Sequence, residues 1–298
     1  MIEKTEPIAK SLYVIGTPIG NLGDLSPRAQ AILQKVSLIA CEDTRYSGQL
    51  LKKLSIKNNL ISFHKHNTKS RIPKLLGFLE EGSSIGLISD AGLPGISDPG
   101  EELVNAAKIE GYKVFCIPGP CAATTALASS GLPSNRFCFE GFLPLKRKDR
   151  EKALLSITSE ERTTVIYESP HRLLRLLQEL LELCGSERPL QVARELTKKH
   201  EEQIGSNIGD VLKHFQQIKP KGEFTIILGG LTPKTDDKKA VDNSQLLKRM
   251  NSLIKKGASA SYAAKEVSKE TGLPKKFLYT ILHEMPNTSS DLDNMQSQ

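Results

Sequence analysis

The stretch Ser84–Gly100, SIGLISDAGLPGISDPG, carries the clearest indication of the fold. Its first part, Ser84–Ser89, is short and mostly apolar, which is typical of a buried strand. The remainder, Ser89–Gly100, contains three glycines, two prolines and two aspartates. A simple turn needs only two or three residues of these kinds. We therefore interpret the stretch as a strand that leads into a binding loop.

The two aspartates of this loop allow different interpretations. Asp90 directly follows the predicted strand, where its carboxylate could accept hydrogen bonds from a ribose or an amine. Asp98 precedes Pro99, so it could equally be only the N-cap of the next helix.

Short apolar runs alternate with helical patterns on both sides of this loop. After Ser26 and Pro27, which suit an N-cap and a first helical position, apolar residues recur at helical spacing. The other strands predicted in this half are Leu12–Ile15, Ser37–Cys41, Leu60–Phe63 and Lys113–Ile117. This alternation predicts a mainly parallel sheet that is covered on both faces.

The second half begins with Phe142–Arg150, a basic segment containing proline that we interpret as an interdomain linker. Strand patterns then resume around an apolar amphipathic helix at Leu173–Leu183. The predicted strands are Thr163–Tyr167, Leu190–Ala193 and Phe224–Leu228. We expect a second α/β unit here.

The predicted fold class is therefore α/β, with two α/β subdomains and a small C-terminal helical element. In that element, two helical patterns are joined at Thr271–Pro274, which is helix-turn-helix spacing. The predicted boundaries are 1–141 for the N-terminal subdomain, 142–231 for the C-terminal subdomain, 232–243 for a linker, 244–286 for the helical element and 287–298 for a disordered tail.

The chain of 298 residues has 41 basic and 34 acidic side chains, a net charge of +7 that suits a polyanionic partner without requiring one. Eight basic and only two acidic residues fall between Leu246 and Lys276. This concentration favours contact with a nucleic-acid backbone, although a solvated face of a small bundle is the simpler alternative. The predicted RNA-binding residues are Lys248, Arg249, Lys255, Lys256, Lys275 and Lys276.

The five cysteines lack C-x-x-C spacing, which argues against a disulfide framework and a zinc site, and we expect them to be small core residues. His64 and His66 lack a third ligand at familiar spacing, so we expect no metal. The N-terminus lacks the apolar run of a signal peptide, and no stretch is long enough to span a membrane. We expect a cytoplasmic protein.

Three further loops follow predicted strands: Gly16–Asp24, Ile117–Ala126 and a charged pair, Tyr167–Arg172 with Ala193–Lys198. The first matches neither the P-loop nor the usual dinucleotide pattern. A strand-to-helix turn, tight helix packing and surface ion pairs are the simpler interpretations of these loops. However, ligands of open α/β sheets bind at the carboxyl ends of strands, where these loops should meet.

Taken together, several stretches resemble one known family. They are VIGTPIGNLGDLSPRA, CEDTR, FHKHN, LISDAGLPGISDPG, IPGPCAATTALASSGLPSNRFCFEGFLP, YESPHRL, ARELTKKHEE and KGEFTIIL. They cover nearly all of Leu12–Gly230, in order. The chain thus resembles the ribosomal small-subunit RNA cytidine 2′-O-methyltransferase I family, within the tetrapyrrole (corrin/porphyrin) methylase superfamily.

The resemblance implies two α/β subdomains of the tetrapyrrole-methylase type with a cofactor cleft between them, S-adenosylmethionine as methyl donor, and a homodimer. The residues that it implies for cofactor binding are Pro18, Asp90, Ala91, Gly92, Leu93, Cys121, Ala122, Glu168 and Ala193. Tetrapyrrole enzymes usually carry Gly-Asp-Pro where this chain has Ser89-Asp90-Ala91, and this departure favours the ribosomal RNA branch.

The implied reaction is 2′-O-methylation of the ribose of a cytidine in small-subunit ribosomal RNA, either free or in the assembled 30S subunit. Alignment of oxygen, methyl and sulfur can supply much of the rate, and a positioned base can add roughly 10²–10⁴-fold. Candidate bases are Glu42, Asp43, Glu195 and Lys198, while Arg45, Arg194 and Lys198 are candidates for holding phosphates. We expect Glu42, Arg45, Glu195 and Lys198 to be the catalytic residues.

Three alternatives remain from sequence. One is a uroporphyrinogen or precorrin methyltransferase on the same fold, against which stands the basic C-terminal element. Another is a non-enzymatic RNA-binding protein, which would not need the dense glycine loops. The third is a DNA-binding regulator led by the helix-turn-helix. Copurified S-adenosylmethionine would separate the enzymes from the binding proteins.

Overall fold

The computed structural model describes residues 6–231, 243–271 and 275–284. The chain divides into two compact units, Met1–Leu231 and Thr232–Gln298. We call the first the catalytic unit, after the activity that the sequence resemblance leads us to expect, and the second the C-terminal unit. The tail predicted at 287–298, and all of the linker predicted at 232–243 except Asn243, lie outside the described residues.

The catalytic unit begins with a five-stranded sheet in the order β3-β2-β4-β1-β5, and every pair of neighbouring strands is parallel. We call this sheet and its helices the first lobe. Its strands are β1 (Ser11–Ile15), β2 (Leu38–Cys41), β3 (Leu60–Ser62), β4 (Ser84–Ile88) and β5 (Lys113–Ile117). The strands predicted in this half are confirmed, with ends that differ by one residue at most.

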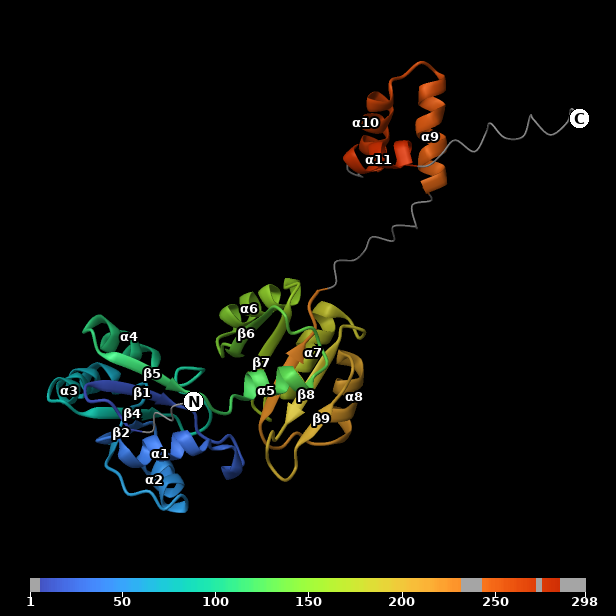
Figure 1. Ribbon diagram of the computed structural model, residues 1–298. Coiled ribbons are helices and arrows are strands. Elements are labelled where there is room, and N and C mark those ends of the chain that lie inside the picture. The colour runs from blue at the N-terminus through green and yellow to red at the C-terminus, as the bar shows by residue number, and fades with distance from the viewer. Residues whose placement is uncertain (1–5, 232–242, 272–274, 285–298) are drawn as a thin grey trace, which may run out of the picture. The chain divides into compact units, whose positions relative to one another are not determined.

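Helices cover both faces of the first sheet (Figure 1). α1 (Pro27–Lys35) and α2 (Thr44–Lys53) pack on one face, and α3 (Thr68–Glu80) and α4 (Glu101–Ile109) pack on the other. A single 3-10 turn, Leu22–Asp24, precedes α1. α1 begins where its sequence indicates, because the Ser26 hydroxyl accepts the Ala29 N–H at 3.1 Å.

The second lobe is a five-stranded sheet in the order β6-β7-β10-β8-β9. Only the β6–β7 pair is parallel, and the other three pairs are antiparallel. Its strands are β6 (Phe137–Phe142), β7 (Thr163–Glu168), β8 (Leu190–Arg194), β9 (Glu202–Ile204) and β10 (Phe224–Leu228). On one face lie α6 (Arg147–Ser159), α7 (Leu173–Cys184) and α8 (Ile208–Gln217).

The segment predicted as an interdomain linker, Phe142–Arg150, is not a linker in the structure. Phe142 ends β6, which already belongs to the second sheet, and α6 begins at Arg147. The chain therefore passes from the first sheet to the second between β5 and β6, before the segment predicted as a linker. The domain boundary at residue 141 stays a prediction.

Helix α5 (Ala122–Ser129) connects the two lobes. It follows β5 of the first sheet but packs on β7 and β10 of the second. Ala123 and Ala126 are buried in one cluster with Val165, Ala193 and Ile227. Because these alanines have only a methyl side chain, the helix can lie close to the sheet.

The C-terminal unit contains α9 (Asn243–Lys255), α10 (Ala260–Thr271) and α11 (Lys275–Glu284). Their shared core includes Leu246, Met250, Ala263, Val267 and Leu278. The helices predicted on both sides of the turn are present, whereas residues 272–274 of the turn lie outside the described residues.

The cysteines differ from the expectation that all are core residues. Only Cys41 is buried, and Cys116 is exposed. Cys116 lies on β5, an edge strand of the first sheet, where its side chain is not covered. Among the described helices, none has the length and apolar character needed to cross a membrane.

Backbone contacts hold the loops after β1, β4 and β5 together. Thr17 and Gly92 form an isolated antiparallel bridge, with N–H to carbonyl distances of 2.9 and 3.2 Å. A Cβ atom on Gly16 would lie 2.7 Å from the Gly119 Cα, and a Cβ on Gly119 would lie 2.8 Å from the Gly16 Cα. Glycine is required at both positions because the approach is between two backbones.

We predict that Gly16→Ala and Gly119→Ala each lower the free energy of unfolding by about 1–3 kcal/mol, since no side-chain rotation can relieve a clash between backbones. Urea unfolding followed by circular dichroism would measure the change. Gly77→Ala is the matched control, because its Cβ would meet no atom within 4 Å inside α3. It should be neutral or stabilising by up to about 1 kcal/mol. Wild-type stability in Gly16→Ala would contradict the assigned contact.

Candidate active site

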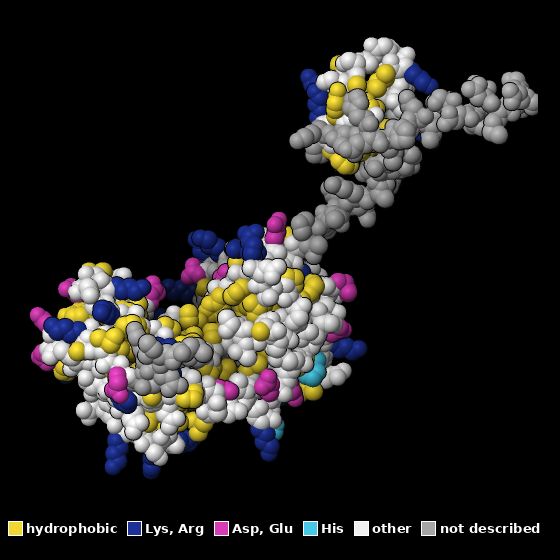
Figure 2. Space-filling view, in the orientation of Figure 1, with side chains coloured by type: hydrophobic (Ala, Val, Ile, Leu, Met, Phe, Trp, Pro, Cys, Tyr) yellow, Lys and Arg dark blue, Asp and Glu magenta, His cyan; other side chains and the backbone are white. Residues whose placement is uncertain are grey.

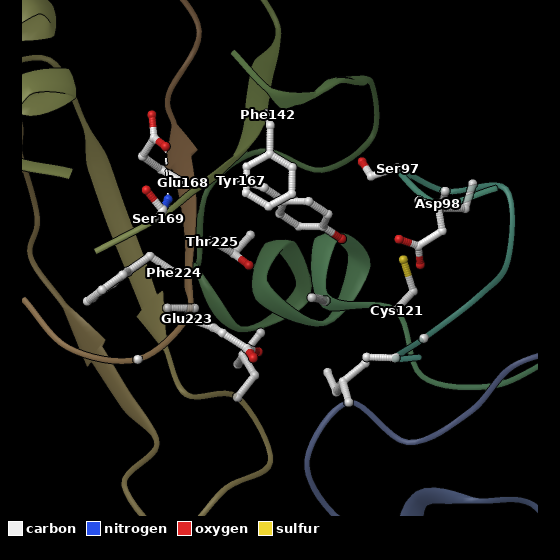
Figure 3. A pocket seen from close by; sticks show the side chains of 18 of the residues that line it. Ser97, Asp98, Cys121, Phe142, Tyr167, Glu168, Ser169, Glu223, Phe224 and Thr225 are labelled. Atoms are coloured by element: carbon white, nitrogen blue, oxygen red, sulfur yellow. Dashed lines mark hydrogen bonds between the residues drawn. The ribbon is translucent and has the colours of Figure 1, made fainter. Parts of the chain in front are cut away.

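A cavity of about 350 Å³ lies between the two lobes of the catalytic unit. The first lobe contributes the loops after β1, β4 and β5, and the second lobe contributes the strand ends that face them (Figure 3). In the space-filling view, hydrophobic side chains gather on the second lobe near the first (Figure 2). The cavity is therefore where the carboxyl ends of the parallel strands meet the second sheet.

Most of the residues that the sequence implied for cofactor binding line this cavity. They are Ala91, Gly92, Leu93, Cys121, Ala122, Glu168 and Ala193. The structure places Pro18 and Asp90 elsewhere, in the wall of a second, smaller hollow. Their chain neighbours Ile19 and Ala91 face the main cavity, so Pro18 and Asp90 lie on the opposite side of the same loops.

Asp98 lies in the cavity wall, and its role as a helix N-cap is not observed. The cap of α4 is Gly100, and Figure 3 shows the Asp98 carboxylate beside Cys121. Burial raises the pKa of Asp98, a hydrogen bond with Ser89 opposes this rise, and the Asp90 charge adds to it. No positively charged side chain is among the causes of this pKa shift. The Asp98 carboxylate would therefore favour a positively charged ligand.

Ser97, which precedes Asp98, lies close to β6 of the second lobe. Its φ of 66° is in the left-handed region, which is uncommon for a residue other than glycine. Its hydroxyl would lie 2.9 Å from a Cβ on Gly141, which is at a bulge in β6 and itself has a φ of 60°. A residue with a side chain at 141 would therefore displace the Ser97 hydroxyl, and its own backbone would be strained at this φ.

Tyr167 forms part of the second-lobe wall of the cavity. From sequence it belonged to a candidate loop, Tyr167–Arg172, but it was not predicted as a site residue. Its hydroxyl accepts the Ala123 N–H at 3.0 Å, at the start of α5. Its ring packs with Phe139 and Phe142, at centroid distances of 5.0 and 5.5 Å. Burial raises the pKa of the Tyr167 hydroxyl, and the nearby Cys121 raises it further, so the hydroxyl stays protonated.

Glu168 is fully buried and is held mainly by cations behind the cavity. Its carboxylate pairs with Arg172 at 2.6 Å and Arg150 at 3.6 Å, and it accepts the Ser169 N–H at 2.8 Å. Removing one partner of such a buried pair is strongly destabilising. We therefore infer that Glu168 positions the wall of the cavity, whereas the sequence predicted a direct cofactor contact.

Glu195 and Lys198 are brought together as an ion pair at the cavity edge. The Lys198 ammonium lies 3.0 Å from Glu195 and 3.0 Å from Glu223, which itself lines the cavity. Burial lowers the pKa of Lys198, but hydrogen bonds to both carboxylates outweigh this effect and raise it. Burial raises the pKa of Glu195, but hydrogen bonds from Lys198 and the Glu223 N–H outweigh that effect and lower it. Both side chains therefore stay charged at neutral pH.

Glu42 and Asp43 follow β2 and have pKa values that move in opposite directions. Asp43 accepts two hydrogen bonds from the Arg45 guanidinium, at 3.1 and 2.7 Å, and these lower its pKa to about 2. Burial raises the pKa of Glu42, and the charges of Asp98, Asp90 and Asp43 raise it further. The Asp43 N–H also donates to Asp90 at 3.2 Å, which joins the ends of β2 and β4.

Basic side chains are exposed in both units. In the C-terminal unit, Lys248, Lys255, Lys256 and Lys275 are exposed, and the Lys276 side chain lies outside the description. Arg249, by contrast, is ion-paired with Glu270 at 3.1 Å. A second basic surface was interpreted as a linker from sequence: Lys and Arg side chains gather over α6 (Figure 2), and its exposed basic residues are Lys146, Arg147, Lys148 and Lys152.

Known proteins share this sequence and this fold. The family model described as Tetrapyrrole (Corrin/Porphyrin) Methylases matches residues 11–212. A Synechocystis protein named ribosomal RNA small subunit methyltransferase I is 46% identical, over 92% of this chain and 98% of its own length. A Thermotoga maritima protein of the same name is 46% identical over 219 residues, 74% of this chain and 98% of its own length.

A solved structure shares the fold at low sequence identity. It is a uroporphyrin-III C-methyltransferase from Thermus thermophilus, complexed with S-adenosylhomocysteine. The TM-score is 0.52 and the identity 18%, over 74% of this chain and 97% of that one. These matches confirm the resemblance seen in the sequence motifs: the chain is a methyltransferase, and it belongs to the tetrapyrrole (corrin/porphyrin) methylase family.

Proposed function

We propose that this chain transfers the methyl group of S-adenosylmethionine to a ribose 2′-hydroxyl of a cytidine in small-subunit ribosomal RNA. The observation that carries the proposal is the cavity between the lobes, on which loops from both sheets converge. The names of relatives 46% identical over most of the chain support an RNA acceptor over a tetrapyrrole. The choice of a ribose 2′-hydroxyl and of a cytidine as the acceptor rests on the family that the sequence motifs resemble.

The cavity residues fit S-adenosylmethionine in three respects. When bound, this cofactor supplies a methyl group on a positively charged sulfur. Leu93, Ile96 and Leu196 offer apolar surface for the nucleoside, and Asp98 offers a half-buried negative charge for the cationic end. Gly92, with a φ of 83°, lets the backbone come close to a ligand.

Among the four candidate bases, Glu42 is the best suited to accept the proton of the acceptor hydroxyl. Lys198 is held protonated by two carboxylates, and Glu195 and Asp43 have lowered pKa values, so these three are poor bases. The raised pKa of Glu42 brings its basicity closer to neutral pH. We infer that Lys198 and Arg45 contribute through their position and positive charge and do not accept a proton.

The acceptor is small-subunit ribosomal RNA, as free RNA or in the assembled 30S subunit. The exposed basic residues of α6 and of the C-terminal unit would contact phosphates. The methylase family model matches residues 11–212, all of which lie in the catalytic unit. We therefore assign the chemistry to the catalytic unit and RNA affinity to the C-terminal unit. The homodimer and the cytoplasmic location implied earlier stay predictions.

Transfer of tritium from labelled S-adenosylmethionine tests this function. The acceptors are small subunits lacking their native 2′-O-methylation, the free RNA from those subunits, and uroporphyrinogen III. Label on a ribose of the RNA is the expected result, and comparison of the first two acceptors shows which form is used. Label in the tetrapyrrole alone would overturn the RNA proposal while leaving the fold assignment intact.

We predict that Asp98→Asn weakens S-adenosylmethionine binding by roughly 10-fold or more, because a hydrogen bond or ion pair to a charged group is lost. Only the ionised carboxylate attracts the cation. Wild-type affinity should therefore fall as the pH drops through the raised pKa of Asp98, while Asp98→Asn should show no such fall. Titration calorimetry at several pH values measures both.

Asp24→Asn serves as the control for Asp98→Asn, since Asp24 is exposed and lies outside the cavity. It should bind the cofactor as the wild type does. Equal affinity of the wild type and Asp98→Asn at neutral pH would show that Asp98 does not face the cationic end.

We predict that Glu42→Gln lowers the single-turnover rate of methyl transfer by roughly 10²–10⁴-fold, with cofactor affinity unchanged. The wild-type rate should rise with pH through the raised pKa of Glu42, because only the carboxylate accepts a proton, and Glu42→Gln should lack this limb. Asp43→Asn keeps the side-chain cap of α2 and should lose far less activity. A full rate in Glu42→Gln would assign the base elsewhere.

A further inference from the structure

A second hollow, of about 120 Å³, lies between the loop after β1 and the first turns of α2. We call it the α2 hollow. Its wall includes Pro18, Leu22, Tyr46, Gln49, Lys53 and Asp90. The proposed function assigns it no role, although two of these residues were expected to bind the cofactor.

The α2 hollow and the main cavity share one wall. Pro18 and Asp90 face the hollow, whereas Ile19 and Ala91, the next residues in the chain, face the cavity. The bridge between Thr17 and Gly92 holds the two loops of this wall together. Only these two short loops would thus separate a group bound in the α2 hollow from a cofactor bound in the main cavity. We call the end of this shared wall the rim.

The side chains around the α2 hollow have the chemistry that recognises a nucleotide. Tyr46 is 52% exposed and Leu22 43% exposed, so an aromatic ring and an apolar side chain are available for stacking. Gln49 is exposed and carries both a donor and acceptor for a base edge. Lys53 is exposed and carries a charge for a phosphate.

Two carboxylates, Asp90 and Asp43, lie in the wall of the α2 hollow or next to it. Asp90 lines it, and Asp43, whose N–H donates to Asp90, is the N-cap of the helix that carries Tyr46. Glu42 adjoins Asp43 in the chain and is influenced by the charges of Asp90 and Asp98. An acceptor hydroxyl at this rim would therefore have a carboxylate near it and the cofactor cavity on its other side.

We propose that the α2 hollow is the subsite for the acceptor nucleoside, a single RNA base taken out of its stack. The base stacks on Tyr46, Gln49 contacts its edge, and Lys53 contacts a neighbouring phosphate. Enzymes that modify a base within a duplex extrude that nucleotide into a pocket, and the α2 hollow offers such a pocket beside the main cavity. The assignment rests on the proposed function, since it requires an RNA acceptor.

Steady-state kinetics of the full chain test this subsite, with small ribosomal subunits lacking native 2′-O-methylation as acceptor and saturating S-adenosylmethionine. Tyr46→Ala should lower kcat/KM for the subunits by roughly 5- to 150-fold, the range expected for loss of one base–aromatic stack. Tyr46→Phe keeps the ring and should stay close to wild type. Gln49→Trp fills the hollow from an exposed helix position and should lower kcat/KM at least as much.

Two controls separate the subsite from other causes. Phe137→Ala removes an aromatic ring that is 39% exposed on β6 and lies outside both hollows, and it should leave kcat/KM unchanged. Cofactor affinity, measured by calorimetry without RNA, should be unchanged in all four variants and also shows that each is folded.

The outcomes distinguish this proposal from the function on which it rests. A wild-type chain that labels no RNA would overturn both. RNA labelling with wild-type kcat/KM in Tyr46→Ala and Gln49→Trp would overturn the subsite alone. Two further results would also reject the subsite: loss of cofactor affinity in Gln49→Trp, or a loss of kcat/KM in Phe137→Ala as large as that in Tyr46→Ala. In either case the loss of kcat/KM would not come from an acceptor base in the α2 hollow.

Discussion

The packing of α5 on the second sheet is the interaction on which the site depends. Only four residues separate this helix from the end of β5, yet Ala123 and Ala126 are buried against Val165, Ala193 and Ile227. The connection from the first sheet is thus part of the core of the second. The start of α5 lines the cavity and donates a backbone N–H to Tyr167, so the same packing that joins the lobes also sets the shape of the cavity.

Charge is separated within the catalytic unit in a way that fits a cationic cofactor and a polyanionic acceptor. Asp98 and Glu42 gather at the carboxyl edge of the first sheet with raised pKa values, while Lys198 is neutralised by Glu195 and Glu223. Exposed basic residues lie instead on outer surfaces such as α6. Neighbouring carboxylates whose environments shift their pKa values apart, as with Glu42 and Asp43, are typical of sites that divide acid–base roles.

The first sheet and the dense loops could be predicted from sequence, because buried parallel strands appear as continuous apolar runs followed by small residues. β6 and β9 could not: β6 is an edge strand with a bulge, and β9 has only three residues. α6 begins with a run of charged residues that suits a helix surface as well as a linker. Strand direction in the second sheet could not be predicted either, because the antiparallel strands β7 and β10 are buried along nearly their whole length, as the parallel strand β4 is. In the site, sequence identified the loops but could not show that Pro18 and Ile19 face different hollows, or that Asp98 faces the cavity.

Backbone strain marks the two places where the lobes touch beside the cavity. Ser97, Glu195 and Thr197 have φ values of 66°, 51° and 66°, and such residues cost about 1–3 kcal/mol each unless their surroundings hold them. Ser97 is held against Gly141, and the loop of Glu195 and Thr197 is held against Gly20, where a Cβ would lie 2.5 Å from the Lys198 Cγ. These contacts lie on loops that line or border the cavity from opposite lobes. A ligand that binds both lobes would therefore favour the relative position of the two sheets in which these strained residues are held.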